Sequence, residues 1–208
     1  MWNYEKRLQF PINIKTPNAE IAKIIISQYG GPDGELGASM RYLSQRYTIP
    51  YKEVAGLLTD IGTEELGHFE MVGTIVYQLT KNLSMEEIEK QGFAPYYVDH
   101  TLALWPQAAG GIPFNSCQFQ SKGDIITDLF EDMAAEQKAR TTYDNILRMV
   151  KDPDVCAPIR FLREREIVHF QRFGEALRIV QENLDPVNFY QYNPEFDNRN
   201  DGCGCGNQ

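Results

Sequence analysis

Glu65-Leu66-Gly67-His68 and Glu166-Ile167-Val168-His169 repeat one pattern at an offset of 101 positions. In each copy a glutamate precedes a histidine by three positions, and on a helix this spacing puts both side chains on one face, about 60° apart. A single glutamate precedes each pair by 30 positions, Glu35 in the first copy and Glu136 in the second. Two single glutamates and two such pairs, each from its own helix, are the ligand set of a dinuclear metal site inside a four-helix bundle.

The repeat extends beyond the candidate ligands. Tyr42 and Tyr143 each follow the single glutamate of their half by seven positions, and two of the chain's 3 histidines fall in the repeat. Further pairs at the same offset are Ala38 with Ala139, Phe69 with Phe170, and Gly73 with Gly174. We therefore expect two helical hairpins of common design that face each other across a pseudo-two-fold axis.

Other polar residues near the repeat have plainer interpretations. A single Glu-x-x-His also occurs as a solvated pair on a surface helix, so the duplication rather than either motif alone indicates a metal site. Tyr42 and Tyr143 are either core aromatics or hydrogen-bond partners of the glutamate about two turns earlier on their own helix. We expect His100 to be structural or solvent-exposed. The charges expected to be caps, surface charges or a subunit contact are Asp33, Asp60, Glu64 and the run Arg163-Glu164-Arg165.

Apolar residues at spacings of three and four predict two long helices around the Glu-His pairs. The first is expected from about residue 52 to 80 and the second from about 152 to 183. Glu65 lies in the middle of an otherwise apolar stripe, and it must be paired or metal-bound because burying an isolated carboxylate is costly. The stripes are Val54, Leu58, Ile61, Val72 and Ile75 in the first helix, and Ile159, Leu162, Phe173 and Leu177 in the second.

Two further bundle helices contain the single glutamates. The helix with Glu35 is expected from about residue 33 to 46, and the helix with Glu136 from about residue 124 to 150. A short helix before the first of them is expected to begin at Thr16-Pro17, with threonine as the cap, and to end at Gly30-Gly31.

The remaining segments predict a long crossover and irregular ends. Prolines and glycines exclude a long helix in residues 81–122, where only a short helix beginning near Ser84 is expected. Residues 1–15 look extended, and no structure is assigned after Pro186. We predict an all-α, ferritin-like four-helix bundle with one long crossover and irregular N- and C-terminal extensions.

Composition limits the classes of partner. Of 208 residues, 29 are acidic and 20 are basic, a balance that argues against nucleic acid or an anionic membrane surface as a partner. No apolar run approaches the roughly 20 residues that span a bilayer. The residues Met1 to Arg7 are too polar for a secretory signal, so we expect a protein that is synthesised in the cytoplasm without a signal peptide.

The cysteines do not form a disulfide framework. Cys117 and Cys156 are isolated, whereas Cys203 and Cys205 lie in a Gly-rich tail. This tail is expected to be disordered with reactive thiols, although the cysteine pair could also bind a soft metal or cross-link to another chain. We predict one domain over residues 1–185 and a C-terminal extension over residues 186–208.

The ligand types indicate the chemistry. Carboxylates and imidazoles suit iron and manganese, whereas zinc sites rarely need as many carboxylates. Carboxylates that bridge two metals hold them close together, and such a pair can exchange two electrons with a bound substrate. The ligand set therefore predicts redox or oxygen chemistry.

Longer segments of the sequence resemble a known family, the manganese catalases, and within it the short spore-coat branch of coat JC-type proteins. The resemblance covers roughly residues 1–185. The segments that match are residues 28–36 (QYGGPDGEL), 57–65 (LLTDIGTEE), 128–136 (DLFEDMAAE) and 161–169 (FLREREIVH). It implies a catalase that disproportionates hydrogen peroxide to water and oxygen with two manganese ions per chain, in the coat of a bacterial spore.

The resemblance also implies a role for each site residue. The metal ligands would be Glu35, Glu65, His68, Glu136 and His169, with Glu65 bridging both metals. Glu166 would hydrogen-bond to metal-bound solvent and shuttle protons, whereas bundle geometry alone would make it a fourth carboxylate ligand. Tyr42 would lie next to the metal ligands without binding a metal itself. One departure is Ala135, because some manganese catalases have an arginine at this position, and the site is therefore expected to be more open.

Two other functions remain open. A di-iron ferritin-like oxidase or ferroxidase would use nearly the same ligands, so iron is an alternative to manganese. A structural spore-coat protein would keep the bundle with little turnover. The resemblance also implies a homo-oligomer, with a hexamer as the expected state, and contacts with other spore-coat proteins.

Overall fold

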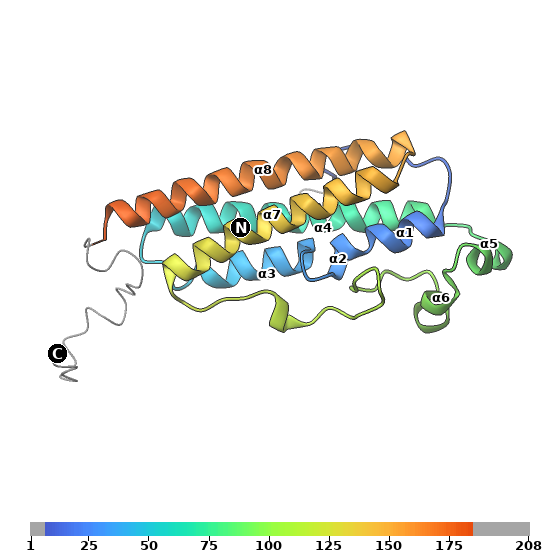
Figure 1. Ribbon diagram of the computed structural model, residues 1–208, viewed down its shortest axis with the longest axis horizontal. Helices are drawn as coiled ribbons and strands as arrows, with labels where there is room; N and C mark the ends of the chain where they lie inside the picture. Colours follow the sequence, from blue (N-terminus) through green and yellow to red (C-terminus); the bar gives the residue numbers. More distant parts are fainter. Residues whose placement is uncertain (1–6, 185–208) are drawn as a thin grey trace.

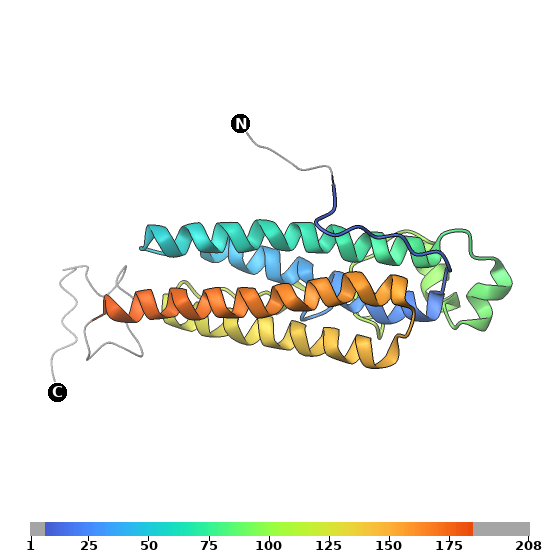
Figure 2. The same ribbon diagram turned by 90° about the horizontal axis from the view of Figure 1, so that it is seen from above.

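The computed structural model describes residues 7–184, and within this range the chain is helical, with one isolated β-bridge between Gln107 and Pro113 and no strand. The four bundle helices are α3 (Glu35–Gln45), α4 (Lys52–Thr80), α7 (Ile125–Met149) and α8 (Pro153–Glu182) (Figure 1). Seen from above, the pair α3 with α4 lies beside the pair α7 with α8 (Figure 2). The predicted all-α, ferritin-like bundle is confirmed, and the four helices begin and end within two residues of the predicted positions.

The first hairpin differs from the second because its leading helix is broken. The short helices α1 (Ala19–Ile25) and α2 (Ser27–Gly30) precede α3 along the same side of the bundle, where the second hairpin has the continuous α7 (Figure 1). A Cβ atom at Gly30 would lie 2.3 Å from the carbonyl carbon of Pro106, so the crossover packs directly on the backbone at the break. The predicted end at Gly30-Gly31 therefore coincides with a close approach between two chain segments.

Side-chain caps set most helix starts. Ser84, Asp124 and Asp152 accept from backbone N–H groups of the first turn in their helices, and Ser84 forms a complete capping box with Glu87. The prediction of Thr16 as the cap of α1 is wrong. Asn18 caps this helix by accepting from the backbone N–H of Ile21 at 3.0 Å.

The crossover contains three short helical segments, α5 (Met85–Lys90), α6 (Ala94–His100) and the 3-10 turn η1 (Ser116–Gln118). It leaves the end of α4 and returns along the outer side of α1 to α3 (Figure 1). The guanidinium of Arg41 donates to the carbonyl oxygens of Gln118 and Phe119, which fixes the end of the crossover to α3.

Two apolar clusters fill the bundle, one toward each end. One packs Met71 and Val72 of α4 against Leu162 of α8, and the other packs Leu58 and Ile61 of α4 against Phe173 and neighbours. Burying each such side chain stabilises the fold by about 1.5–3 kcal/mol. Both Glu-His pairs lie between the clusters, so apolar packing on either side offsets the cost of a buried polar layer.

The N-terminal segment lies on the bundle without forming a strand. The backbone N–H of Ile14 donates to the side chain of Gln78 at 2.7 Å, and Gln78 donates to the carbonyl of Ile12 at 3.0 Å. Phe10 packs on Phe161 of α8. Within residues 7–184 no helix combines the length and the apolar character needed to cross a membrane. The predicted extension over residues 186–208 lies outside the described residues.

Candidate metal centre

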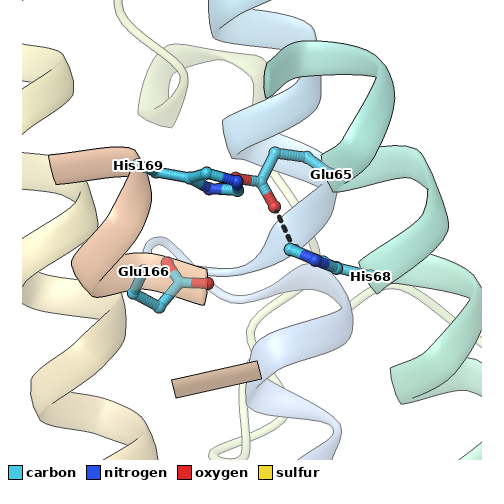
Figure 3. Close-up of side chains that lie close together, drawn as sticks. All are labelled: Glu65, His68, Glu166 and His169. Carbon is cyan, nitrogen blue, oxygen red and sulfur yellow. Dashed lines mark hydrogen bonds and ion pairs between the residues drawn. The ribbon is translucent and has the colours of Figure 1, made fainter. Parts of the chain in front are cut away.

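The structure brings all six glutamates and histidines of the repeat into one buried layer. Glu35 comes from α3, Glu65 and His68 from α4, Glu136 from α7, and Glu166 and His169 from α8. None of the six is more than 2% exposed. Four of them, namely Glu65, His68, Glu166 and His169, each place a ligand atom within 4.8 Å of the others (Figure 3).

Glu65 lies between the two imidazoles. Its Oε2 atom is 2.7 Å from Nδ1 of His68, and its Oε1 atom is 2.7 Å from Nδ1 of His169 (Figure 3). Each Nδ1 atom also faces the single glutamate of one half, with Glu35 Oε2 at 3.9 Å from His68 and Glu136 Oε2 at 3.5 Å from His169. The layer therefore offers two equivalent positions, each with one imidazole, one glutamate of its own and one oxygen of the shared Glu65.

Several polar atoms of this layer lack hydrogen bonds. Glu65 Oε1, Glu136 Oε2, Glu166 Oε1 and His169 Nδ1 have no hydrogen-bond partner of suitable geometry within residues 7–184, although His169 Nδ1 lies close to Glu65. Leaving a buried polar atom unsatisfied costs about 1–3 kcal/mol. Metal coordination would satisfy such carboxylate and imidazole atoms, so the donors fit two metal ions of the iron or manganese type.

The pKa values of the buried Glu35, Glu65 and Glu166 are shifted in opposite directions. Burial raises the pKa of Glu35 well above its usual range, with the neighbouring Glu65 as the second cause. Burial acts on Glu65 in the same direction, but the two histidines override it and hold the pKa of this carboxyl well below its usual range. Burial also raises the pKa of Glu166 well above normal, helped by the charges of three nearby glutamates. Burial therefore favours the protonated form of Glu166, whereas the two histidines favour the ionised form of Glu65.

At the two histidines, burial lowers the pKa and the neighbouring carboxylates raise it. Burial lowers the pKa of His68, yet Glu65, Glu64 and Glu35 raise it to about 10. The same competition at His169, with Glu65, Glu136 and Glu64 as partners, raises its pKa to about 12. Both rings therefore hold protons that a metal ion must displace at neutral pH.

Two buried tyrosines support the single glutamates. The hydroxyl of Tyr42 donates to Glu136, and the hydroxyl of Tyr143 donates to Glu35. The expected hydrogen bond to the glutamate of the same helix is wrong, because α3 and α7 run antiparallel and place each tyrosine beside the glutamate of the other helix. Burial, followed by the charge of the partner glutamate, raises the pKa of each tyrosine well above normal, so both remain hydrogen-bond donors.

Glu64 lies on the side of the imidazoles that faces away from Glu65. Its carboxylate is 3.1 Å from Nε2 of His169 and 3.6 Å from Nε2 of His68, and Arg165 holds it with two hydrogen bonds of 2.8 and 3.1 Å. The expectation that Glu64 and Arg165 are surface charges or a subunit contact is therefore wrong. The sequence contained one signal for this pair, because positions 64 and 165 are themselves related by the offset of 101.

The other expected surface charges lie outside the layer. Asp60 pairs with Arg172 at 2.8 Å, and both side chains are substantially exposed. Arg163 pairs with Asp144 and with the exposed Glu164. His100 is part of α6, where its ring stacks on Trp105 at 4.7 Å and contacts Tyr96, as expected for a structural histidine.

A narrow recess lies between α3 and α7, against Glu35, Glu136 and Glu166, with room for about one water molecule. Small residues line it in pairs at the offset of the repeat, namely Gly34 with Ala135 and Ala38 with Ala139. Asp33, whose side chain is partly exposed, also lines the recess and marks its outer end. The recess therefore lies on the side of the polar layer opposite Glu64.

Comparisons with known proteins agree with the geometry. The family model described as manganese containing catalase matches residues 1–200. Protein CotJC of Bacillus subtilis (strain 168) is 54% identical over 185 residues, which cover 89% of this chain and 97% of that protein. A probable manganese catalase of Clostridium acetobutylicum is 33% identical over 183 residues, which cover 87% and 81%. The crystal structure of KatB, a manganese catalase from Anabaena, superposes with a TM-score of 0.81 at 29% identity, covering 89% of this chain and 84% of that one.

Proposed function

The chain belongs to the family of manganese-containing catalases, and from this premise we propose that it disproportionates hydrogen peroxide to water and oxygen at two manganese ions per chain. The observation that supports the proposal most strongly is the position of Glu65. This carboxylate presents one oxygen to each histidine at 2.7 Å, and each histidine has a second glutamate of its own.

The proposed ligands follow from this arrangement. Glu35 and His68 would hold one metal, Glu136 and His169 would hold the other, and both would share Glu65. Each histidine uses Nδ1, because this atom of both rings faces the carboxylates of the layer. The bound pair supplies reversible two-electron exchange with peroxide.

We assign Glu166 to proton transfer rather than to metal binding. It is buried beside Glu136, and burial together with its acidic neighbours raises its pKa well above normal. A carboxyl with a raised pKa can act as a general acid toward a departing oxygen and as a general base in the other half of the cycle. Glu166 lines the recess, and we propose that peroxide approaches the layer there.

The tyrosines and the recess complete the proposed site. The hydroxyl of Tyr42 donates to one oxygen of Glu136, and that of Tyr143 donates to one oxygen of Glu35. The other oxygen of each glutamate is left for the metal. Ala135 adds little volume to the recess, so peroxide reaches the layer without displacing a large side chain.

The test is a metal analysis of purified protein, combined with assays of oxygen evolution from peroxide and of ferrous oxidation. We expect about two manganese ions per chain and rapid oxygen evolution when the protein is produced with ample manganese. Fast ferrous oxidation without oxygen evolution would favour the di-iron oxidase, whose ligands are nearly the same. Two bound metals with neither activity would favour a structural role.

We also propose that the protein is a homo-oligomer, a hexamer by resemblance, in the coat of a bacterial spore, where it contacts other coat proteins. The similarity to protein CotJC supports the location. Exposed apolar residues on and near the crossover, including Val98, Trp105 and Ile112, provide surface suited to subunit contacts. Light scattering at micromolar concentration tests the oligomer, and immunodetection in separated spore layers tests the location.

A further inference from the structure

The contacts of Glu64 separate it from every other acidic residue near the site. Its Oε2 atom lies 3.1 Å from Nε2 of His169 and its Oε1 atom lies 3.6 Å from Nε2 of His68. Its side chain is 15% exposed, so solvent screens it only in part. Glu64 thus faces both imidazoles from the far side of the layer, within hydrogen-bond distance of His169 and slightly beyond it from His68, whose Nε2 has no other partner among residues 7–184.

An imidazole that binds a metal through Nδ1 must hold its proton on Nε2, and the partner of Nε2 decides whether that tautomer is favoured. A carboxylate has two acceptor oxygens and no donor, so a single one can accept from two rings. We propose that Glu64 is a positioning residue that accepts the Nε2–H of both histidines and thereby presents both Nδ1 atoms to the metals. This inference rests on the proposed dimetal site.

Arg165 completes the arrangement. Its guanidinium donates to both oxygens of Glu64, at 2.8 and 3.1 Å, and fixes the plane of the carboxylate between the two rings. Positions 64 and 165 are counterparts in the repeat. A second glutamate at 165 would bring two like charges together, whereas arginine neutralises and orients the single carboxylate that serves both histidines.

A purely structural ion pair between α4 and α8 is available for comparison. Asp60 and Arg172 also join these helices, at 2.8 Å, but Asp60 is exposed and Arg172 half-buried, and among residues 7–184 no hydrogen bond or ion pair links either to the histidines. Asp60→Asn is therefore a matched control for Glu64→Gln. Both changes remove one negative charge and replace a carboxylate by an amide on the same helix, one turn apart.

The first experiment compares these two variants with the unaltered protein. Manganese affinity is measured by competition with a chelator, and thermal unfolding of the metal-free proteins reports on structural damage. The protonated nitrogen of each ring is identified by ¹⁵N NMR on zinc-loaded, ¹⁵N-histidine-labelled protein, with His100 as the internal reference.

We expect Glu64→Gln to weaken manganese binding by about 10- to 100-fold. The amide offers one acceptor and one donor, so only one ring keeps its Nε2–H bond and the ¹⁵N signals of His68 and His169 become different from each other. Asp60→Asn should leave both readouts unchanged. Unaltered affinity and unaltered ¹⁵N signals in Glu64→Gln would overturn the inference.

A charge exchange provides a second test that does not depend on the first variant. Glu64→Arg and Arg165→Glu should each lose manganese affinity, because each brings two like charges together. The double variant moves the carboxylate to the counterpart position and should recover binding to within about tenfold of the unaltered protein. A double variant whose metal-free form unfolds normally but which fails to bind manganese would contradict the inference.

The outcomes for the inference and for the proposed function can be told apart. If the unaltered protein binds no pair of metals, the proposed function fails before Glu64 is considered. If it binds two metals with the same affinity as Glu64→Gln, only the positioning role of Glu64 fails.

Discussion

The hairpin of α3 and α4 resembles the hairpin of α7 and α8 at the tyrosines, which lie away from the pseudo-two-fold axis between the hairpins. The two hairpins differ at Glu65 and Glu166, which lie close to this axis. Away from the axis, Tyr42 and Tyr143 make equivalent bonds to the glutamate of the opposite hairpin. On the axis, Glu65 faces both histidines, whereas its counterpart Glu166 holds a raised pKa beside Glu136. Only one carboxylate can lie between the two imidazoles. Glu65 takes this position, and its counterpart Glu166 is therefore available for proton transfer.

The largest effect should come from the residue that both halves share. Replacing Glu65 with glutamine removes the proposed bridge from both metal positions, and we expect loss of both manganese ions and of oxygen evolution. Metal analysis and an oxygen electrode applied to one preparation measure both quantities. Retention of one metal per chain would show that the two positions are independent and would break the comparison.

The two histidines should have equal effects because they are equivalent across the axis. His68→Ala and His169→Ala are each expected to abolish activity and to lower the melting temperature of the metal-loaded protein. A metal present at 100 times its Kd stabilises the folded state by about 2.7 kcal/mol, and the variants lose this contribution. Calorimetry with and without a chelator measures it.

His100→Ala is the control for these variants, since His100 contacts Tyr96 and Trp105 in the crossover. It should leave manganese content unchanged. Equal loss of metal in all three variants would place His100 at the site and contradict our assignment.

Glu166→Gln should show that Glu166 and its counterpart Glu65 have different roles. The amide keeps the shape of the side chain but cannot exchange a proton, so turnover is expected to fall by about 10²-fold or more. Manganese content should stay near two per chain, in contrast with Glu65→Gln. Lost metal would make Glu166 a fourth carboxylate ligand, and retained turnover would exclude proton transfer by this residue.

Acid should weaken metal binding in both halves together. The pKa of His68 is raised to about 10 and that of His169 to about 12, so both rings are protonated below these values in the metal-free protein. Metal binding displaces these protons, and affinity should therefore fall as pH falls, by up to about tenfold per pH unit for each proton displaced. Chelator competition between pH 6 and 8 measures the slope, and a pH-independent affinity would contradict it.

The smallest effect is expected from the tyrosines. Tyr42→Phe and Tyr143→Phe each remove one hydrogen bond to a terminal glutamate, which is worth about 1.5–3 kcal/mol when the acceptor is charged. Manganese should dissociate faster from both variants, to the same extent, when a chelator is added. Unequal rates of manganese dissociation from the two variants would show that the two hairpins also differ at the tyrosines.

The sequence predicted the layer but only part of its surroundings. The repeat at 101 positions located the four bundle helices and the six residues of the layer, because spacing along a helix determines which side chains share a face. The partners of Tyr42 and Tyr143 depend on the relative direction of two helices, which spacing within one helix does not encode. Whether each of the six residues binds metal stays a prediction.

Glu64 was missed for a different physical reason. Glu64 precedes Glu65 by one position, which puts it about 100° around the helix from the apolar stripe of α4, where a charged residue usually faces solvent. Only packing against α8 brings Arg165 and both histidines to it. The sequence predicts Thr16 as the cap because proline follows it, whereas Asn18, which is also a favourable cap, takes this position in the structure.

The contact between Glu64 and Arg165 also bears on how such a protein can arise. In a dimer of two identical hairpins, residue 64 of each hairpin would meet its own copy across the axis, so opposite charges at that point would be unattainable. Joining both hairpins in one polypeptide lets the two positions diverge. The salt bridge between Glu64 and Arg165 thus requires two hairpins of different sequence, which a single chain that contains both hairpins provides.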